Sequence, residues 1–586
     1  MDLAMSNPEA IAHRPRSMIW SGVALYCGTG LLSIIIVIAS LSLWRADLRV
    51  PFDYRPDGHD AFVNMMLAKT VIETGWTWHN PNLGAPGTLD LLDFPIPQSL
   101  HDAAFFCLSF FTHDFGLLLN LYFLLAFPLI AVTTTLAARQ IGLGAAASIL
   151  VAQLFTFLPF HFWRGQGHLA LGAYYAVPLI LPSILAIGSG VTLVRSKRLT
   201  GFVGFALVAL SSPYYAAFAA FFLFVAAFAS YVRRHDLVAL KAAAAMAGIL
   251  CGTFFLQISP NLIYAARSRP NPALGIRGPN EGDLYALHLA QMLLPVPGHR
   301  IPALANVRAW YAINAPMVNE NEASTLGVVG SFGFLILLFR MLFRRSINHS
   351  QPQWDGTLDL LAVLLLAGIL LATVGGLGPL LNYFGFKMLR AYNRISIFLA
   401  MFSLFAVGIL IDRFTTRYLR ANPWHGAGFC GLILCIGLLD QISPQVIPNY
   451  VQNQADFVSD ARFVASIETR MPAGAAIFQL PLMAYPESPP VNELGDYELF
   501  RGYLHSSTLR WSYGAIKGRE ASQWQRSVFA LPFEMSMAQI RARGFSGIYL
   551  DRRGFRDNTA EMALRSLLGP PMVSQDGRLL FFNMSH

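Results

Sequence analysis

The stretch DYRPDGHD at residues 53–60 opens the most polar part of an otherwise apolar chain. It belongs to a segment, residues 45–115, that follows one hydrophobic span and precedes another. The segment is rich in carboxylates and imidazoles, and these residues are Asp47, Asp53, Asp57, Asp60, Asp90, Asp93, Asp102, Asp114, His59, His79, His101 and His113. Part of this excess of carboxylates and imidazoles is explained by a loop that is solvated at a membrane surface. A catalytic or binding role at the same surface would explain the rest.

The composition indicates a membrane protein with many spans. The 586 residues are 55% hydrophobic and only 13% charged, with a mean hydropathy of +0.48, whereas soluble domains carry about 25% charged residues. The formal net charge is +9, but the basic residues stand in short clusters between apolar segments. That pattern is a topology signal and argues against nucleic acid as a partner. The five cysteines show neither metal-site spacing nor a disulfide framework.

A membrane crossing takes about 20 apolar residues, and we expect eleven spans. They lie near residues 18–44, 116–138, 143–160, 169–190, 200–212, 214–231, 237–258, 326–345, 357–375, 394–412 and 426–442. Basic residues mark the cytoplasmic side, so residues 1–17 form a cytoplasmic N-terminus and the first span is a signal anchor. Basic clusters flank residues 200–231 on both sides, which favours two crossings with a break at Ser211-Ser212-Pro213.

An odd number of spans places residues 443–586 outside the cytoplasm. The apolar runs shorten there and charged residues return. Segments 476–480 and 547–550 are typical of strands, and residues 462–470 and 558–568 look helical. We therefore expect a polytopic α-helical membrane domain over residues 18–442, followed by an extracytoplasmic C-terminal α/β or α+β domain. The outside loops of the membrane domain are residues 45–115, 161–168, 259–325 and 376–393.

The candidate catalytic residues are Asp57 and Asp60, which stand three positions apart. The neighbouring proline and glycine place Asp57 in a turn, and Asp60 begins a helix predicted over residues 60–74. A carboxylate held at a membrane surface can act as a general base. The simpler interpretation is a helix cap within a solvated loop.

The other outside loops supply candidate substrate-binding residues. Arg164 lies at a membrane boundary, where its guanidinium either matches the oxygens of a lipid phosphate or simply snorkels. Cations at residues 387–394 break the positive-inside trend and need an anionic partner, for which a lipid phosphate is suitable. The full set of expected substrate-binding residues is His59, Asp93, Arg164, His168, Glu320, Glu322, Lys387, Arg390 and Arg394.

The order of these features resembles the GT-C superfamily of integral-membrane glycosyltransferases. A first helix is followed by a large outside loop with an Asp-rich start, Arg55-Pro56-Asp57-Gly58-His59-Asp60, then by many spans and an outside C-terminal domain. The stretches 322–327 and 390–394 also look like those of uncharacterised bacterial membrane proteins described as glycosyltransferases or sugar translocases. The resemblance covers about residues 18–442. It implies a sugar donor on a polyprenyl-phosphate carrier and a catalytic carboxylate in the first outside loop.

These features lead to the hypothesis of a membrane glycosyltransferase that moves a sugar from a polyprenyl-phosphate carrier to an extracytoplasmic glycan or lipid acceptor of the cell envelope. Asp57 or Asp60 would act as the base of an inverting displacement. Arg390 and Arg394, with Lys387 or Arg164, would hold the leaving phosphate. No residue spacing demands a metal, although the acidic loop leaves room for a divalent cation on oxygen ligands.

Three alternatives stay open. A flippase or transporter of lipid-linked sugars would use the same cations without a base, although the few charges within the spans count against it. A transferase of acyl or phosphoglycerol groups would also use an outside histidine or aspartate. A scaffold of envelope assembly would need neither. Topology and resemblance together indicate the bacterial inner membrane, with the bilayer itself as a partner.

Overall fold

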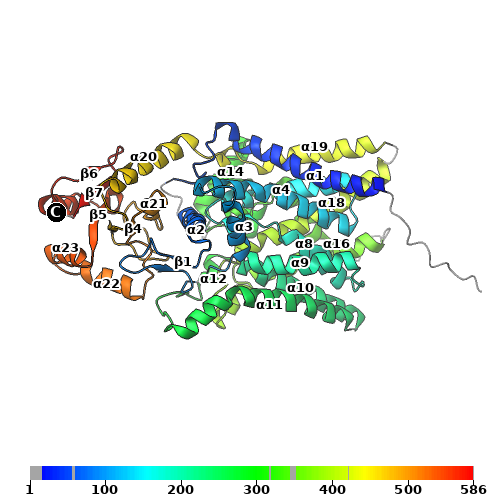
Figure 1. Cartoon of the computed structure of the whole chain (residues 1–586). Coiled ribbons are helices and arrows are strands. Elements are labelled where there is room, and N and C mark those ends of the chain that lie inside the picture. The colour runs from blue at the N-terminus through cyan, green and yellow to red at the C-terminus, as the bar shows by residue number, and fades with distance from the viewer. Residues whose placement is uncertain are drawn as a thin grey trace, which may run out of the picture.

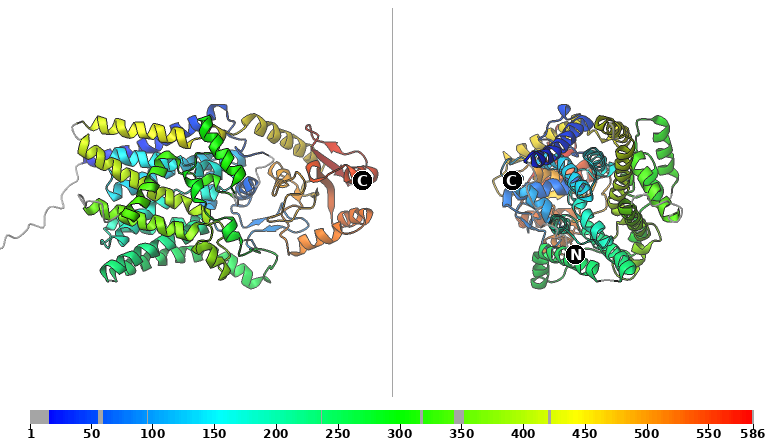
Figure 2. Two further views of the ribbon diagram at one scale, coloured as in Figure 1. Left: turned by 180° about the vertical axis from the view of Figure 1, so that it is seen from behind. Right: turned by 90° about the vertical axis from the view of Figure 1, so that its right-hand side faces the viewer.

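The computed structural model describes residues 16–55, 60–94, 96–235, 237–315, 319–343, 352–419 and 422–584. A bundle of long helices occupies one end of the molecule, and a β-sheet with its own helices occupies the other (Figure 1). Figure 2 shows the same division from behind and the helices seen end on. We call the end of the bundle that meets the sheet the sheet end. Asp57 and His59 lie outside the described residues.

Each of the eleven expected spans coincides with a helix, which confirms the polytopic helical fold. These helices are α1 (Arg16–Leu41), α4 (Phe115–Ile141), α5 (Ala145–Thr156), α8 (Val177–Gly188), α9 (Arg195–Ser211), α10 (Pro213–Arg234), α11 (Val238–Arg267), α15 (Gly327–Phe343), α16 (Pro352–Ala372), α18 (Ser396–Tyr418) and α19 (Pro423–Gln441).

The number of full-length spans is lower than expected. Among the described residues, seven helical stretches are long and apolar enough to cross a membrane. An eighth is added if Trp424–Gln441 and Pro444–Glu468, which meet at a bend of 65°, are counted together as one span. The expected span at 169–190 is instead divided into α7 (Leu169–Gly172) and α8, which leaves only 12 residues for α8. A full crossing takes about 20 residues, so α8 is too short for one.

Close helix packing builds the interior of the bundle. α18 lies at the centre of the bundle. In its most apolar 18-residue segment 89% is buried, whereas in the same kind of segment of α1 only 22% is buried. α15 approaches α18 so closely at Gly333 that an added Cβ would overlap the carbonyl oxygen of Ser403. The predicted break between α9 and α10 is present: Ser212 is extended, and Pro213 takes the first helical position, where its missing N–H loses no helix hydrogen bond.

The polar segments fold into short elements at the sheet end. Residues 45–115 form α2 (Asp60–Thr74), with the bounds predicted from the sequence, followed by a hairpin of β1 (His79–Asn80) and β2 (Leu89–Asp90) and by α3 (Ser99–Ser109). Figure 1 places α2, β1 and α12 between the bundle and the sheet. The later elements are α6 (Pro159–Arg164), α12 (Glu281–Leu284), α13 (Leu289–Leu293), α14 (Pro302–Asn314), η2 (Glu322–Ser324), α17 (Leu377–Tyr383) and η4 (Tyr392–Ile395).

The C-terminal part contains a five-stranded mixed sheet in the order β4-β3-β5-β7-β6. β3 pairs in parallel with β4 and β5, and β7 pairs antiparallel with β5 and β6. The strands are β3 (Ala476–Leu480), β4 (Arg510–Trp511), β5 (Phe545–Asp551), β6 (Met572–Val573) and β7 (Leu579–Asn583), and the helices are α20 (Tyr450–Glu468), α21 (Phe500–Leu504), α22 (Glu520–Phe529), α23 (Phe533–Ala542) and α24 (Thr559–Leu568). The expected sheet-containing C-terminal domain is confirmed.

The first polar segment covers the β4 edge of this sheet. Leu83 forms a parallel bridge with Trp511, whose side chain is fully buried. The Trp511 N–H donates to the carbonyl of Asn82 at 2.8 Å, and the Gly84 N–H donates to the carbonyl of Tyr513 at 2.9 Å. Residues 82–84 therefore continue the sheet across the junction with the bundle.

Candidate functional site

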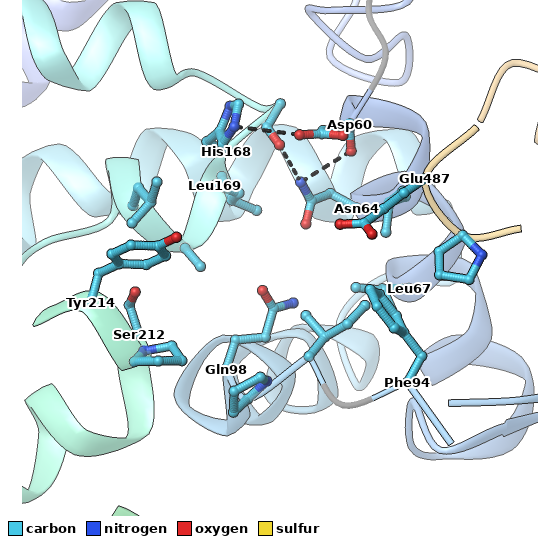
Figure 3. A pocket seen from close by; sticks show the side chains of 18 of the residues that line it. Asp60, Asn64, Leu67, Phe94, Gln98, His168, Leu169, Ser212, Tyr214 and Glu487 are labelled. Carbon is cyan, nitrogen blue, oxygen red and sulfur yellow. Dashed lines mark hydrogen bonds and ion pairs between the residues drawn. The ribbon is translucent and has the colours of Figure 1, made fainter. Parts of the chain in front are cut away.

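A cavity of about 390 Å³ lies at the sheet end, between α2, the loop before α7, the start of α10 and the C-terminal domain. The carboxylate, guanidinium and imidazole groups in its lining belong to Asp60, His168, Arg277, Glu320, Arg390, Arg394 and Glu487. Figure 3 shows Asp60, Asn64 and Glu487 on one side of this cavity, with Ser212 and Tyr214 across from them. Five residues that the sequence singled out therefore line one space, although they come from four separate polar segments.

Asp60 is the first residue of α2 and reaches the cavity beside His168. Its Oδ2 lies 3.4 Å from the Nε2 of His168, and 47% of the Asp60 side chain is exposed. One turn further along α2, the Asn64 amide donates to the carbonyls of Gln166 and Gly167 at 2.8 and 3.1 Å. These two bonds hold the loop before His168 against α2, which fixes the contact between the carboxylate and the imidazole.

His168 is a neutral side chain in this setting. Burial lowers its pKa, and the positive charges of Arg164 and Arg394 lower it further, to about 3. The imidazole therefore stays uncharged at physiological pH. It offers Asp60 a dipole rather than a counter-charge.

Glu320 joins two guanidinium groups at the back of the cavity. Its Oε2 lies 2.8 Å from Nη1 of Arg164 and 3.6 Å from Nη2 of Arg394. Burial alone would raise the pKa of Glu320, but Arg164 and Arg394 lower it to about 2, so the carboxylate is ionised. Arg394 also lies over the ring of Tyr214 at 4.3 Å. Among the described residues its Nε is buried and has no hydrogen-bond partner, while 13% of the Arg394 side chain is exposed.

Arg390 is held at the cavity by two contacts. Its Nη1 lies 2.6 Å from Oε2 of Glu281, and its guanidinium lies 5.1 Å from the ring centre of Tyr285. Arg390 and Arg394 therefore present two oriented guanidinium groups, a geometry that suits phosphate oxygens.

A second cavity of about 380 Å³ lies on the other side of the loop 165–168. Gly165 and Gln166 line this second cavity, whereas Gly167 and His168 line the first. Asp53 and Trp163 also face the second cavity. One short loop therefore separates two spaces of nearly equal size.

Other expected site residues lie elsewhere. Asp93 accepts hydrogen bonds from Nε of Arg519 at 2.7 Å and from the Asn271 amide at 2.9 Å, so it ties the first polar segment to the C-terminal domain. Lys387 is exposed, and Glu322 begins η2; neither lines the cavity. Within the described residues, no group of three or more His, Cys, Asp or Glu side chains is placed to hold a metal ion.

The predicted site residues did not include Arg277, Glu487 and Tyr497, which are among the residues that line the cavity. Glu487 and Tyr497 come from the C-terminal domain, about 430 residues beyond Asp60 in the chain. No local pattern marks them. The one available signal is that acidic and aromatic residues cluster in a proline-rich stretch at 485–500.

No protein-family model and no curated protein matches the chain. Among solved structures, the oligosaccharyltransferase AglB from Archaeoglobus fulgidus, in complex with an inhibitory peptide and a dolichol-phosphate, has 11% identity over 91% of this chain and 70% of its own, with a TM-score of 0.44. ArnT from Cupriavidus metallidurans bound to undecaprenyl phosphate has 11% identity over 96% of this chain and 98% of its own, with a TM-score of 0.44. At these identities and TM-scores, neither likeness carries an argument about the family of this chain or its reaction.

Proposed function

We propose that this chain is a membrane glycosyltransferase that takes a sugar from a polyprenyl-phosphate carrier and transfers it to a hydroxyl acceptor outside the cytoplasm. The observation that supports this most directly is one cavity that has the carboxylate of Asp60 and the guanidinium groups of Arg390 and Arg394 in its lining. A base and an anion-binding pair in one space are what a displacement from a sugar phosphate needs.

In the proposed step, Asp60 takes the proton of the acceptor hydroxyl, and the oxygen attacks the anomeric carbon. The bond from that carbon to the phosphate oxygen breaks, and the electron pair leaves with the phosphate. Arg390 and Arg394 bind the charge that develops there. A single displacement inverts the anomeric carbon. Asp57 is kept as the alternative base.

The carrier and the acceptor are proposed to reach the site by separate routes. Two of the similar structures contain dolichol-phosphate or undecaprenyl phosphate, and the proposal extends this class of carrier to the present chain. The reacting hydroxyl of the acceptor has to lie in the first cavity beside Asp60, so the second cavity, across the loop 165–168, is proposed only as the approach of the acceptor, where Trp163 and Asp53 offer the mixed aromatic and polar lining that suits carbohydrates. We place the reaction on the outer face of a bacterial inner membrane.

A donor panel tests the proposal. The purified protein is supplied with polyprenyl-phosphate hexoses and pentoses, and sugar release or transfer is measured for the wild type, Asp57→Asn and Asp60→Asn. We expect one donor to be consumed and Asp60→Asn to lower turnover by about 10²-fold or more, with carrier binding retained. Asp47→Asn, an exposed carboxylate of the same segment, serves as the matched control. Donors that bind without being consumed by any form would favour a transporter instead.

A further inference from the structure

A loop of the C-terminal domain, residues 485–497, enters the cavity beside Asp60. Tyr485, Glu487 and Tyr497 all line it. Three non-glycine residues of this loop have positive φ: Glu487 (59°), Asn492 (53°) and Tyr497 (67°). Such backbone conformations are uncommon and persist where the surroundings hold them, often at ligand clamps.

The half-buried carboxyl group of Asp496 holds both ends of this loop. Its Oδ2 accepts the Ser488 N–H and its Oδ1 accepts the Tyr497 N–H, each at 2.9 Å. The Glu487 N–H donates to the hydroxyl of Tyr497 at 3.1 Å. The backbone of Glu487 is therefore fixed by protein contacts alone, before any ligand is present.

A row of alternating charges connects Glu487 to the guanidinium group of Arg390. The Glu487 carboxylate pairs with Arg277, the charge of Arg277 acts on Glu281, and Glu281 pairs with Arg390 at 2.6 Å. If Arg390 holds the donor phosphate, then Glu487 lies at the far end of this row, on the wall that it shares with Asp60 and Asn64 (Figure 3). Since Arg390 and Glu487 line the same cavity, a sugar on that phosphate would lie between them.

We propose that Glu487 is a specificity-determining residue that accepts hydrogen bonds from hydroxyls of the transferred sugar, an inference that rests on the proposed function. An ionised carboxylate is an acceptor with two oxygens, and sugar hydroxyls are donors. The Glu487 side chain is 29% exposed despite its ion pair, so a ligand can reach it. Sites built to hydrogen-bond a hydroxyl reject analogues that lack it. The C-terminal domain then selects the donor instead of only covering the site.

Binding of farnesyl phosphate carriers tests this inference. We compare the Kd of bare farnesyl phosphate with that of farnesyl phosphate bearing each sugar of a hexose and pentose series, for the wild type and Glu487→Gln. The wild type should bind one sugar-bearing carrier better than the bare carrier, and Glu487→Gln should weaken that carrier by about tenfold without affecting the bare one. Glu493→Gln, an exposed glutamate of the same loop, is the matched control and should bind like the wild type.

A charge swap separates recognition from a merely structural role. The double variant Glu487→Arg with Arg277→Glu can re-form the ion pair, but it presents the opposite charge to the sugar. Because it also places a carboxylate near Glu281, sugar-dependent binding is expressed relative to the bare carrier in the same variant, which removes any effect on Arg390. Recognition predicts that sugar-dependent binding stays lost in the swap, whereas a structural role predicts that the swap restores it. An equal loss for bare and sugar-bearing carriers in Glu487→Gln would also overturn the inference. A wild type that gains nothing from any sugar would instead overturn the proposed function, and the inference with it.

Discussion

Nε2 of His168 lies 3.4 Å from Oδ2 of Asp60, yet the two side chains do not form an ion pair, because burial and two nearby arginines keep the imidazole neutral. The pKa of His168, about 3, lies below its ordinary value of 6.5. As the pH falls, the unfolded chain therefore takes up a proton at this residue before the folded chain does.

This difference predicts a loss of stability in acid. The contribution of His168 is fully present above about pH 6.5 and declines as the pH falls from there toward 3, by at most about 2 kcal/mol at pH 5. His168→Gln should remove this part of the acid sensitivity, which is measured as the change in thermal midpoint in detergent between pH 7.5 and pH 5. The exposed His79 provides the control variant, His79→Gln. An unchanged acid sensitivity in His168→Gln would contradict the assignment of a neutral imidazole.

Arg394 and Lys387 should differ sharply in their effect on carrier binding. Arg394 lines the cavity, whereas Lys387 is exposed outside it. Arg394→Gln should raise the Kd of a polyprenyl phosphate by about tenfold or more, and Lys387→Gln should change it by less than about threefold. Calorimetry in detergent measures both. A larger effect of Lys387→Gln would place the phosphate outside this cavity.

The contact between Asp93 and Arg519 predicts a structural effect for a residue that the sequence marked as substrate-binding. The Asp93 side chain is 6% exposed and pairs with an arginine 426 positions away. Arg519→Asp should speed proteolysis at the junction of the bundle with the C-terminal domain, because it sets two carboxylates against each other.

The swap Asp93→Arg with Arg519→Asp should return the proteolysis rate to near that of the wild type. If Asp93 bound substrate instead, the swapped protein would be intact and still unable to bind donor. Limited proteolysis and donor binding, measured on the same preparation, separate these two results.

Two glycines in helices should respond to alanine in opposite ways. Gly333→Ala should lower stability by about 1–3 kcal/mol, because the new methyl group would overlap the Ser403 carbonyl on α18. Gly248 of α11 has no atom within 4 Å of an added Cβ, so Gly248→Ala should be neutral or stabilising by up to about 1 kcal/mol. Thermal midpoints in detergent check the pair. Equal midpoints would mean that α15 and α18 pack less closely than the structure has them.

Local chemistry explains what could be predicted from the sequence. The start of α2 at Asp60, the break at Ser212 and the strand at 476–480 each depend on residues that are neighbours in the chain. Hydropathy also located all eleven apolar helices. It overestimated the number of full crossings, because a window of apolar composition does not register the interruption that separates α7 from α8.

Contacts between distant segments explain what could not be predicted. The residue types of the cavity were recognised at Asp60, His168, Glu320, Arg390 and Arg394, since each stands out in an apolar chain. The pairing of Asp93 with Arg519 and the entry of Glu487 into the cavity depend on how the C-terminal domain docks. The residue pattern around Asp93 and the residue pattern around Glu487 do not indicate which distant segment each will contact.

The bridge between Leu83 and Trp511 has a consequence for how the C-terminal segment behaves on its own. Residues 82–84 occupy the hydrogen-bonding groups of β4 that would otherwise face solvent. Cut away from the helices, the C-terminal segment would present a bare strand edge and uncover the indole of Trp511. Open edges recruit strands from other molecules and start aggregation. The helical part of the chain therefore protects the sheet from self-association, and a truncated sheet domain is a poor substitute for the full-length protein.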